Sequence, residues 1–223
     1  MKRVRWLRAQ WPFTMPNLAA SMKAHLFTID SFDGFVIDRV RDDSVDGRYV
    51  EKFSYKESVI DPFGNEESFD RVSYRSTDFT LYTEYPNIEI RNGFRNSREL
   101  LNKMQEICNF SVAIVPVDIG LLDIVETFQK KVNHKVIIDS LQISDFQLET
   151  GISAKILIKG DKDVREALRN LSGERKFSLD KVQIKIPTGQ KVVSINISSN
   201  GSVAIPEDSF REFSTALRQS LLE

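Results

Sequence analysis

The chain has 223 residues, of which 41% are hydrophobic and fifteen are phenylalanine, which excludes a wholly disordered protein. Its formal net charge at pH 7 is −1, so bulk charge predicts neither a nucleic-acid nor a membrane partner. The charge is unevenly spread. Residues 1–29 carry five basic side chains and no acid, residues 30–90 carry fifteen acids against seven bases, and residues 151–223 carry nine acids against twelve bases.

The single cysteine, Cys108, excludes a disulfide within the chain and indicates a reducing compartment. No apolar run approaches the roughly 18 residues that a membrane span needs. The first residues also lack the apolar segment of a secretory signal. We therefore expect a cytoplasmic protein with no membrane partner. Met22 offers an alternative start, which would leave residues 1–21 outside the native protein.

Residues 1–13, MKRVRWLRAQWPF, allow three interpretations. As a strand, they place Val4 and Trp6 on one face, with Arg3 and Arg5 on the other. As an arm, the same arginines would enter a nucleic-acid groove. A targeting segment would need a helix with arginines on one side, which Pro12 would cut short. We favour a packed strand and rank the nucleic-acid arm second.

The acidic region over residues 30–70 predicts several short strands separated by Asp-Gly and Asp-Pro-Phe-Gly turns. Its aromatic residues are available either to fill a core or to anchor a protein partner. They are Phe32, Phe35, Tyr49, Phe53, Tyr55, Phe63 and Phe69. Further along, alternation and helical spacing predict more elements. These are strands over 71–76, 78–86 and 87–92, a helix over 95–107, a strand buried on both faces over 109–117, and a helix over 119–132.

The last third of the chain has the clearest pattern. Two short strand runs over 134–149 come first, followed by a strand over 152–160 and a helix over 162–172. Three strands then end in a helix. The three strands are expected over 180–186, 192–198 and 203–205, and the helix over 206–222. Asn200-Gly201 predicts a tight hairpin between the last two strands, because both turn positions need positive φ.

These elements predict an α+β fold, mainly an antiparallel sheet with about four helices on one side. We expect two halves, an N-terminal half over 1–133 and a C-terminal half over 134–223. The order of strands followed by a helix recurs between 71–104 and 181–217, which suggests an internal duplication, although a β-meander followed by a helix is a common arrangement.

Residues 152–222 resemble one repeat of the TATA-box-binding-protein fold in their element order. The closest local likeness is INISSNGSV before the final strand and helix. The resemblance implies a curved sheet with helices on its convex side. That family inserts paired phenylalanines between base steps. Phe177 stands near one such place, but Ile197 occupies the other, so the resemblance does not imply TATA recognition.

The strands over 152–160, 180–186 and 192–198 predict one polar sheet face. If their apolar residues pack against helices, strand alternation places the intervening residues on the opposite face. Those residues are Lys155, Lys159, Lys181, Lys185, Gln183, Ser194 and Asn196. Acids are expected only at the margin, at Asp180. Such a face can contact phosphates without reading base sequence, although lysines also simply solvate an exposed sheet.

Catalytic and metal motifs are absent from the sequence. His25 and His134 have no zinc-ligand spacing, and a Cys108–His134 nucleophile–base pair rests on spatial proximity alone. The acids of DRVRDDSVDG (residues 38–47) match no cation-binding loop. We expect no catalytic residue, no cofactor and no metal.

We therefore predict a non-catalytic protein that binds nucleic acid, with duplex DNA as the first choice. The predicted contact residues are Lys155, Lys159, Lys181, Lys185, Asn196, Arg3 and Arg5. The alternative is a protein–protein interaction or assembly subunit that uses the acidic, aromatic-rich N-terminal half.

Overall fold

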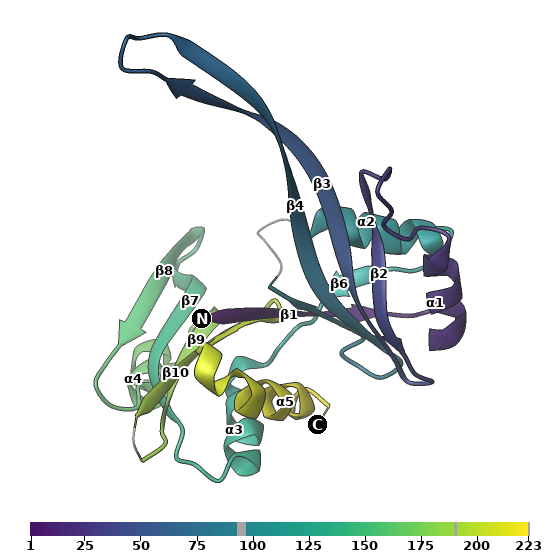
Figure 1. The fold of residues 1–223 in the computed structure, drawn as a ribbon. Helices are drawn as coiled ribbons and strands as arrows, with labels where there is room; N and C mark the ends of the chain where they lie inside the picture. The colour runs from purple at the N-terminus through teal and green to yellow at the C-terminus, as the bar shows by residue number, and fades with distance from the viewer. Residues whose placement is uncertain (93–96, 190, 223) are drawn as a thin grey trace. The chain divides into compact units, whose positions relative to one another are not determined.

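The structure is a computed structural model, and it describes residues 1–92, 97–189 and 191–222. The chain is α+β, with antiparallel strands and five α-helices among the described residues. Its internal contacts divide it into two compact units (Figure 1). The hairpin unit comprises residues 9–114, and the open-face unit comprises residues 1–8 and 115–223. The halves expected from the sequence, and their duplication, stay predictions.

The hairpin unit packs two helices beside a four-stranded antiparallel sheet. Its elements are α1 (Met15–Lys23), β2 (Asp33–Val40), β3 (Ser44–Ile60), β4 (Glu66–Tyr82), β5 (Ile88–Arg91) and α2 (Arg98–Ile107). The strand order is β2-β3-β4-β5. Three buried aromatic rings fill its core: the ring centroid of Phe35 lies 5.3 Å from that of Tyr49 and 5.9 Å from that of Phe79.

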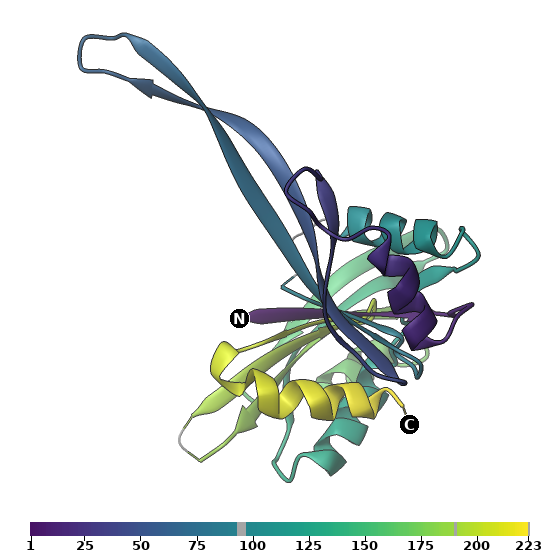
Figure 2. The ribbon, with the colours of Figure 1, turned by 45° about the vertical axis from the view of Figure 1, so that its right-hand side comes forward.

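The main feature of this unit is the length of β3 and β4. Each strand has 17 residues, and they pair without a break from Ser44↔Tyr82 to Ile60↔Glu66. The pairing of β2 with β3 reaches Glu51, and that of β5 with β4 reaches Asp78. The outer part therefore projects as a two-stranded ribbon (Figures 1 and 2). We call residues 51–75 the arm.

The expectation of several short strands over residues 30–70 is wrong. The Asp-Gly pattern predicts a turn at Asp46-Gly47, yet Gly47 lies inside β3. A Cβ at Gly47 would stand 2.7 Å from the Val36 carbonyl oxygen, so glycine serves a close approach of backbones there. The Asp61–Gly64 turn at the tip of the arm does form, because Asp61 Oδ1 accepts hydrogen bonds from the backbone N–H groups of Phe63 and Asn65, each at 2.8 Å.

The open-face unit contains the rest of the chain. Its elements are β1 (Lys2–Ala9), β6 (Ile114–Pro116), α3 (Leu121–Lys131), β7 (Ile137–Glu149), β8 (Ile152–Lys159), α4 (Arg165–Ser172), β9 (Ser178–Pro187), β10 (Val192–Ser198), β11 (Ser202–Ile205), a 3-10 turn (Glu207–Ser209) and α5 (Phe210–Ser220). Six of the strands form an antiparallel sheet in the order β1-β11-β10-β9-β7-β8.

The sheet of the open-face unit is apolar on one side only. The inward residues of β9 and β10 are all buried, as strand alternation predicts. They are Val182, Ile184, Ile186, Val193, Ile195 and Ile197. Helices α3 and α5 lie side by side and contact this sheet through β9 and β11 (Figure 1). Phe128 of α3 packs against Phe213 of α5, with ring centroids 6.0 Å apart.

Residues 2–9 form a packed strand, which confirms the favoured interpretation of the N-terminal stretch. β1 pairs with β11 from Lys2↔Ile205 to Arg5↔Ser202. The next element, α1, is a helix that the sequence analysis does not predict. Proline suits the first turn of a helix, and here Pro16 lies in that turn. The buried residues Met15, Leu18, Ala19 and Met22 follow helical spacing.

Three other expectations need correction. The strands expected over 71–76 and 78–86 are one strand, β4. The two runs over 134–149 are one strand, β7, with local bulges. The fully buried strand expected over 109–117 is only the three-residue β6, which is partly exposed. Asn109 and Phe110 instead adopt positive φ values of 50° and 55°, which turn the chain after α2.

We expect Gly201→Ala to destabilise the chain by about 3 kcal/mol. Gly201 has a φ of 82°, and its Cβ would stand 2.5 Å from the Trp6 carbonyl oxygen. Gly189→Ala is the matched control, because Gly189 has a φ of 81° with open space around its Cβ position, so it should cost only about 1 kcal/mol. Urea denaturation of both variants measures the difference. Equal losses would show that φ strain alone acts at Gly201.

Candidate nucleic-acid interface

Cross-strand pairing aligns the predicted site residues into rows on the polar side of the open-face sheet. Residues directly opposite each other in an antiparallel pair point to the same face. The first row follows the pairs Lys159↔Ser140, Ser140↔Gln183, Gln183↔Asn196, Asn196↔Ala204 and Ala204↔Arg3. It therefore crosses all six strands. At about 4.8 Å per strand, this row is about 24 Å long.

A second row lies beside the first. It follows the pairs Leu157↔Gln142, Gln142↔Lys181 and Lys181↔Ser198, and it continues at the other edge with Ser202↔Arg5. The two rows enclose a shallow hollow of about 220 Å³. Its lining residues are Ser140, Gln142, Leu157, Lys159, Lys181, Gln183 and Asn196. We call the two rows, together with Lys155 and Lys185, the polar face.

The four lysines of the polar face differ in their partners. Lys185 Nζ lies 3.1 Å from Asp139 Oδ2, and Lys155 Nζ lies 3.3 Å from Asp180 Oδ2. Within the described residues, Lys159 and Lys181 have no carboxylate within 4.0 Å of their ammonium groups, and both flank the hollow. Lys159 and Lys181 are therefore the cations most available to an anionic ligand.

The expectation that acids stand only at the margin is wrong, because Asp139 belongs to this face. It is the extra residue of a bulge in β7, where Ile138 pairs with Ile184 and Ser140 with Gln183. Its side chain is only 1% exposed, and Oδ2 also accepts a hydrogen bond from Gln183 Nε2 at 3.3 Å. Among the described residues, Oδ1 is buried with no hydrogen-bond partner. The carboxylate thus depends on Lys185 and Gln183.

Asp180 is held more firmly by its neighbours. Ser144 Oγ donates a hydrogen bond to Oδ1 at 2.6 Å, and Gln142 Nε2 donates one to Oδ2 at 3.4 Å. The pKa of the Asp180 carboxyl is lowered below its usual value. The largest cause is the hydrogen bond from Ser144, and the Lys155 ammonium and Gln142 contribute in the same direction. Asp180 is therefore ionised at neutral pH and offsets the charge of Lys155.

All seven predicted site residues lie on this one sheet, with Arg3 exposed and Arg5 half-buried on β1. Six cations against the two carboxylates Asp139 and Asp180 leave four positive charges. Sequence reasoning missed Ser140, Gln142 and Leu157, which line the hollow. The alternation of Ile138, Leu141 and Ile143 was their signal, but the bulge at Asp139 puts the two parts of β7 out of phase.

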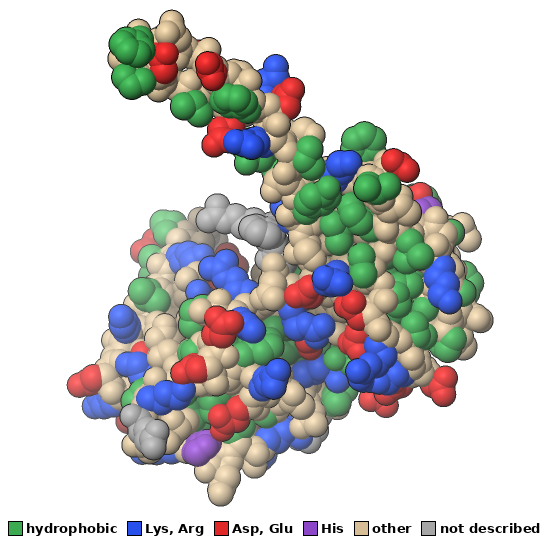
Figure 3. Space-filling view, in the orientation of Figure 1, with side chains coloured by type: hydrophobic (Ala, Val, Ile, Leu, Met, Phe, Trp, Pro, Cys, Tyr) green, Lys and Arg blue, Asp and Glu red, His purple; other side chains and the backbone are tan. Residues whose placement is uncertain are grey.

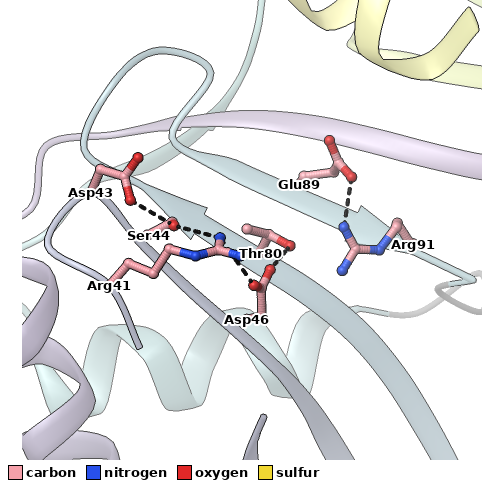
Figure 4. A network of polar contacts seen from close by, with 7 residues as sticks. All are labelled: Arg41, Asp43, Ser44, Asp46, Thr80, Glu89 and Arg91. Carbon is pink, nitrogen blue, oxygen red and sulfur yellow. Dashed lines mark hydrogen bonds and ion pairs between the residues drawn. The ribbon is translucent and has the colours of Figure 1, made fainter. Parts of the chain in front are cut away.

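In the hairpin unit, the arginines on and beside β3, β4 and β5 are accompanied by acidic side chains (Figure 4). Arg41 contacts Ser44 and Asp46, and Arg91 Nη1 lies 2.8 Å from Glu89 Oε1. Thr80 Oγ1 donates a hydrogen bond to Asp46 Oδ1 at 2.8 Å, across the β3–β4 pair. Because each of these two arginines lies beside a carboxylate, they are less available to an anionic ligand than Lys159 and Lys181 are.

The residues considered for chemistry, Cys108 and His134, belong to different units. Cys108 is fully buried, and burial raises the pKa of its thiol, which disfavours the thiolate. His134 Nε2 lies 3.9 Å from Glu212 Oε1, on the helix side of the open-face sheet. In the part of the chain that the structure describes, no three His, Cys, Asp or Glu side chains gather as they would around a metal ion.

Comparison with models of known protein families gives no match, and neither does comparison with curated protein sequences. Among the described helices, none has the length and apolar character needed to cross a membrane.

We expect Lys185→Met to destabilise the chain by roughly 2 kcal/mol, because it leaves the buried Asp139 carboxylate without its cation. Lys181→Met is the matched control on the same strand and face, and it should cost less than about 0.5 kcal/mol. Adding Asp139→Asn to Lys185→Met should recover part of the loss. Urea denaturation at pH 7 checks all three. Equal effects of the two lysine variants would contradict the importance of the Lys185–Asp139 pair.

Proposed function

We propose that this protein binds nucleic acid without catalysis, with duplex DNA as the first ligand to test, through the polar face. The observation that supports this is the first row, in which a lysine, three neutral hydrogen-bonding side chains and an arginine stand on five of the six strands, with Ala204 on the sixth. Nucleic acid presents one phosphate charge per about 3.4 Å along a strand. A row of about 24 Å is therefore long enough to meet several phosphates.

The residues of the polar face suit phosphate and sugar contacts. Lys159 and Lys181 supply mobile ammonium groups, while Gln183, Asn196 and Ser140 supply neutral donors. Such contacts position a protein on a duplex and carry no base-specific information. Binding of this kind follows charge and groove shape. We also propose a cytoplasmic location, on the evidence of the single, buried cysteine.

The test is a fluorescence-anisotropy titration with duplex DNA, single-stranded DNA and duplex RNA at 50 and 200 mM salt. Each phosphate contact contributes about 0.9 to the slope of log K against log salt. Four such contacts would weaken binding about 150-fold between the two salt concentrations. Duplex DNA should bind most tightly of the three.

Two variants of equal charge change make this test specific. Lys159→Glu/Lys181→Glu reverses the two cations beside the hollow, and we expect at least a tenfold loss of affinity and a smaller salt slope. Lys130→Glu/Arg211→Glu reverses two exposed cations on α3 and α5, which lie on the other side of the sheet, and should retain most of the affinity. Absence of binding at micromolar protein, or equal losses in both variants, would overturn the proposal.

A second function, that of a protein-assembly subunit, is favoured by the arm. Phe35 and Tyr49 are buried in the core, but Phe53, Tyr55 and Phe63 are exposed. Exposed aromatic side chains are effective anchors for a protein partner. To test this, proteins retained from a cell extract by the wild-type chain are compared with those retained by a chain that lacks the arm. Equal retention would overturn this second function.

A further inference from the structure

The arm leaves apolar side chains exposed on both of its faces. Cross-strand pairs assign them to the faces by their alternation. One face carries Phe53, Tyr55, Val59 and Phe69, and the other carries Ile60, Val72 and Tyr74, each at least 40% exposed. Phe63, at the tip, is 90% exposed. Figure 3 shows hydrophobic side chains on the surface of the arm along its length.

An isolated two-stranded ribbon is only marginally stable in water. The root of the arm has neighbours, because the Lys52 N–H donates a hydrogen bond to the Phe32 carbonyl oxygen at 2.6 Å and the Tyr74 ring centroid lies 6.1 Å from that of Phe27. From Lys52 to Ile60 and from Glu66 to Arg75, neither strand pairs with a third strand among the described residues. The ten cross-strand pairs from Glu51↔Arg75 to Ile60↔Glu66 make the arm about 30 Å long. A partner must therefore cover an extended, narrow surface.

The charges of the arm are separated along its length. Its root, residues 51–56 and 71–75, carries Lys52, Lys56, Arg71 and Arg75 against one acid, Glu51. Its outer part, residues 57–70, carries five acids and no cation. The acids of the outer part are Glu57, Asp61, Glu66, Glu67 and Asp70.

Both faces of the ribbon share this polarity. On one face Arg71 and Arg75 lie toward the root, with Glu57 and Glu67 toward the tip. On the other face Lys52 and Lys56 lie toward the root, with Glu66 and Asp70 toward the tip. Two arms side by side with their tips in the same direction would oppose like charges. Antiparallel arms would place each acidic outer part against the other arm's basic root.

We infer that the arm is a dimerisation element, whose occupant is the antiparallel arm of a second copy of this chain. The inference rests on the second function proposed above, a protein contact through the arm, and names its partner. A two-fold axis makes such a contact self-complementary. It covers the full length of the arm, because the second arm is of equal length, and it pairs each charged end with its opposite.

On the face of the arm that carries Phe53, Tyr55 and Phe69, two arginines of the root lie beside aromatic rings. The Arg75 guanidinium lies 5.4 Å from the Phe53 ring centroid, and that of Arg71 lies 5.9 Å from the Phe69 centroid. Arg71 Nε also lies 2.8 Å from Glu57 Oε2. Arginine and aromatic residues are the types enriched where protein interfaces bind most strongly. A second arm would exclude water from these contacts.

Sedimentation velocity over 1 to 100 μM protein tests the inference. The full chain should sediment with twice the monomer mass at the upper concentrations. A chain in which residues 52–74 are replaced by an Asn-Gly turn closes the hairpin at Glu51↔Arg75 and should remain monomeric. Circular dichroism confirms that this variant stays folded. A full chain that is monomeric at 100 μM, or an arm-deleted chain that still dimerises, overturns the inference.

Charge reversal tests the antiparallel direction. Glu66→Lys/Asp70→Lys in the outer part and Lys52→Glu/Lys56→Glu at the root, all on one face of the arm, should each weaken dimerisation at least tenfold. A chain that carries all four changes should recover the dimer, because each reversed end again meets an opposite charge. Lys130→Glu/Arg211→Glu, outside the arm, serves as the control and should dimerise as the wild type does. Failure of the fourfold variant to recover overturns the antiparallel arrangement.

These outcomes separate the inference from the broader function. A monomeric full chain excludes the second copy as the occupant. The comparison of retained proteins described above then decides independently whether the arm contacts a different protein. Equal retention with and without the arm would remove the protein-contact function as well.

Discussion

Strand alternation in the open-face unit is the constraint on which the rest of that unit depends. On β9 and β10, every second residue is a buried valine or isoleucine, and the helices α3 and α5 contact that side. The intervening lysine, glutamine, serine and asparagine side chains then have only the other face to occupy. Hydrogen-bonded register finally aligns residues from six strands into rows. The composition of the polar face thus follows from the way the core is filled.

One local irregularity modifies this scheme. The bulge at Asp139 brings a carboxylate into the polar face, where it takes up the charge of Lys185. A face of uniformly free lysines would repel itself, and an exposed sheet of such charge would bind any polyanion. Asp139 and Asp180 instead concentrate the available charge on the two lysines beside the hollow, Lys159 and Lys181.

Much of the open-face unit could be predicted from the sequence, because its elements are short and strongly periodic. The strands containing Ile156, Ile184 and Ile195, and the helix containing Phe213 and Leu217, lie where their patterns placed them. Prediction failed where one residue type has two uses. Gly47 packs closely inside a strand instead of turning the chain, and Pro16 lies in the first turn of a helix instead of breaking it. Such uses depend on tertiary neighbours that local sequence does not contain.

The continuity of β3 and β4 gives the hairpin unit a mechanical property. The β3–β4 pairing continues without a register shift from Gly47↔Phe79 in the core to Ile60↔Glu66 beside the tip. The direction of the arm is therefore set by the twist of the strands in the core. The 14 residues from Gly47 to Ile60 span about 45 Å, so a small rotation at one end produces a large displacement at the other. A rotation of a few degrees in the packing beneath Gly47 would displace the tip by several ångströms. Conversely, a partner that displaces the tip would strain the packing of Phe35, Tyr49 and Phe79 at the base of the same strands.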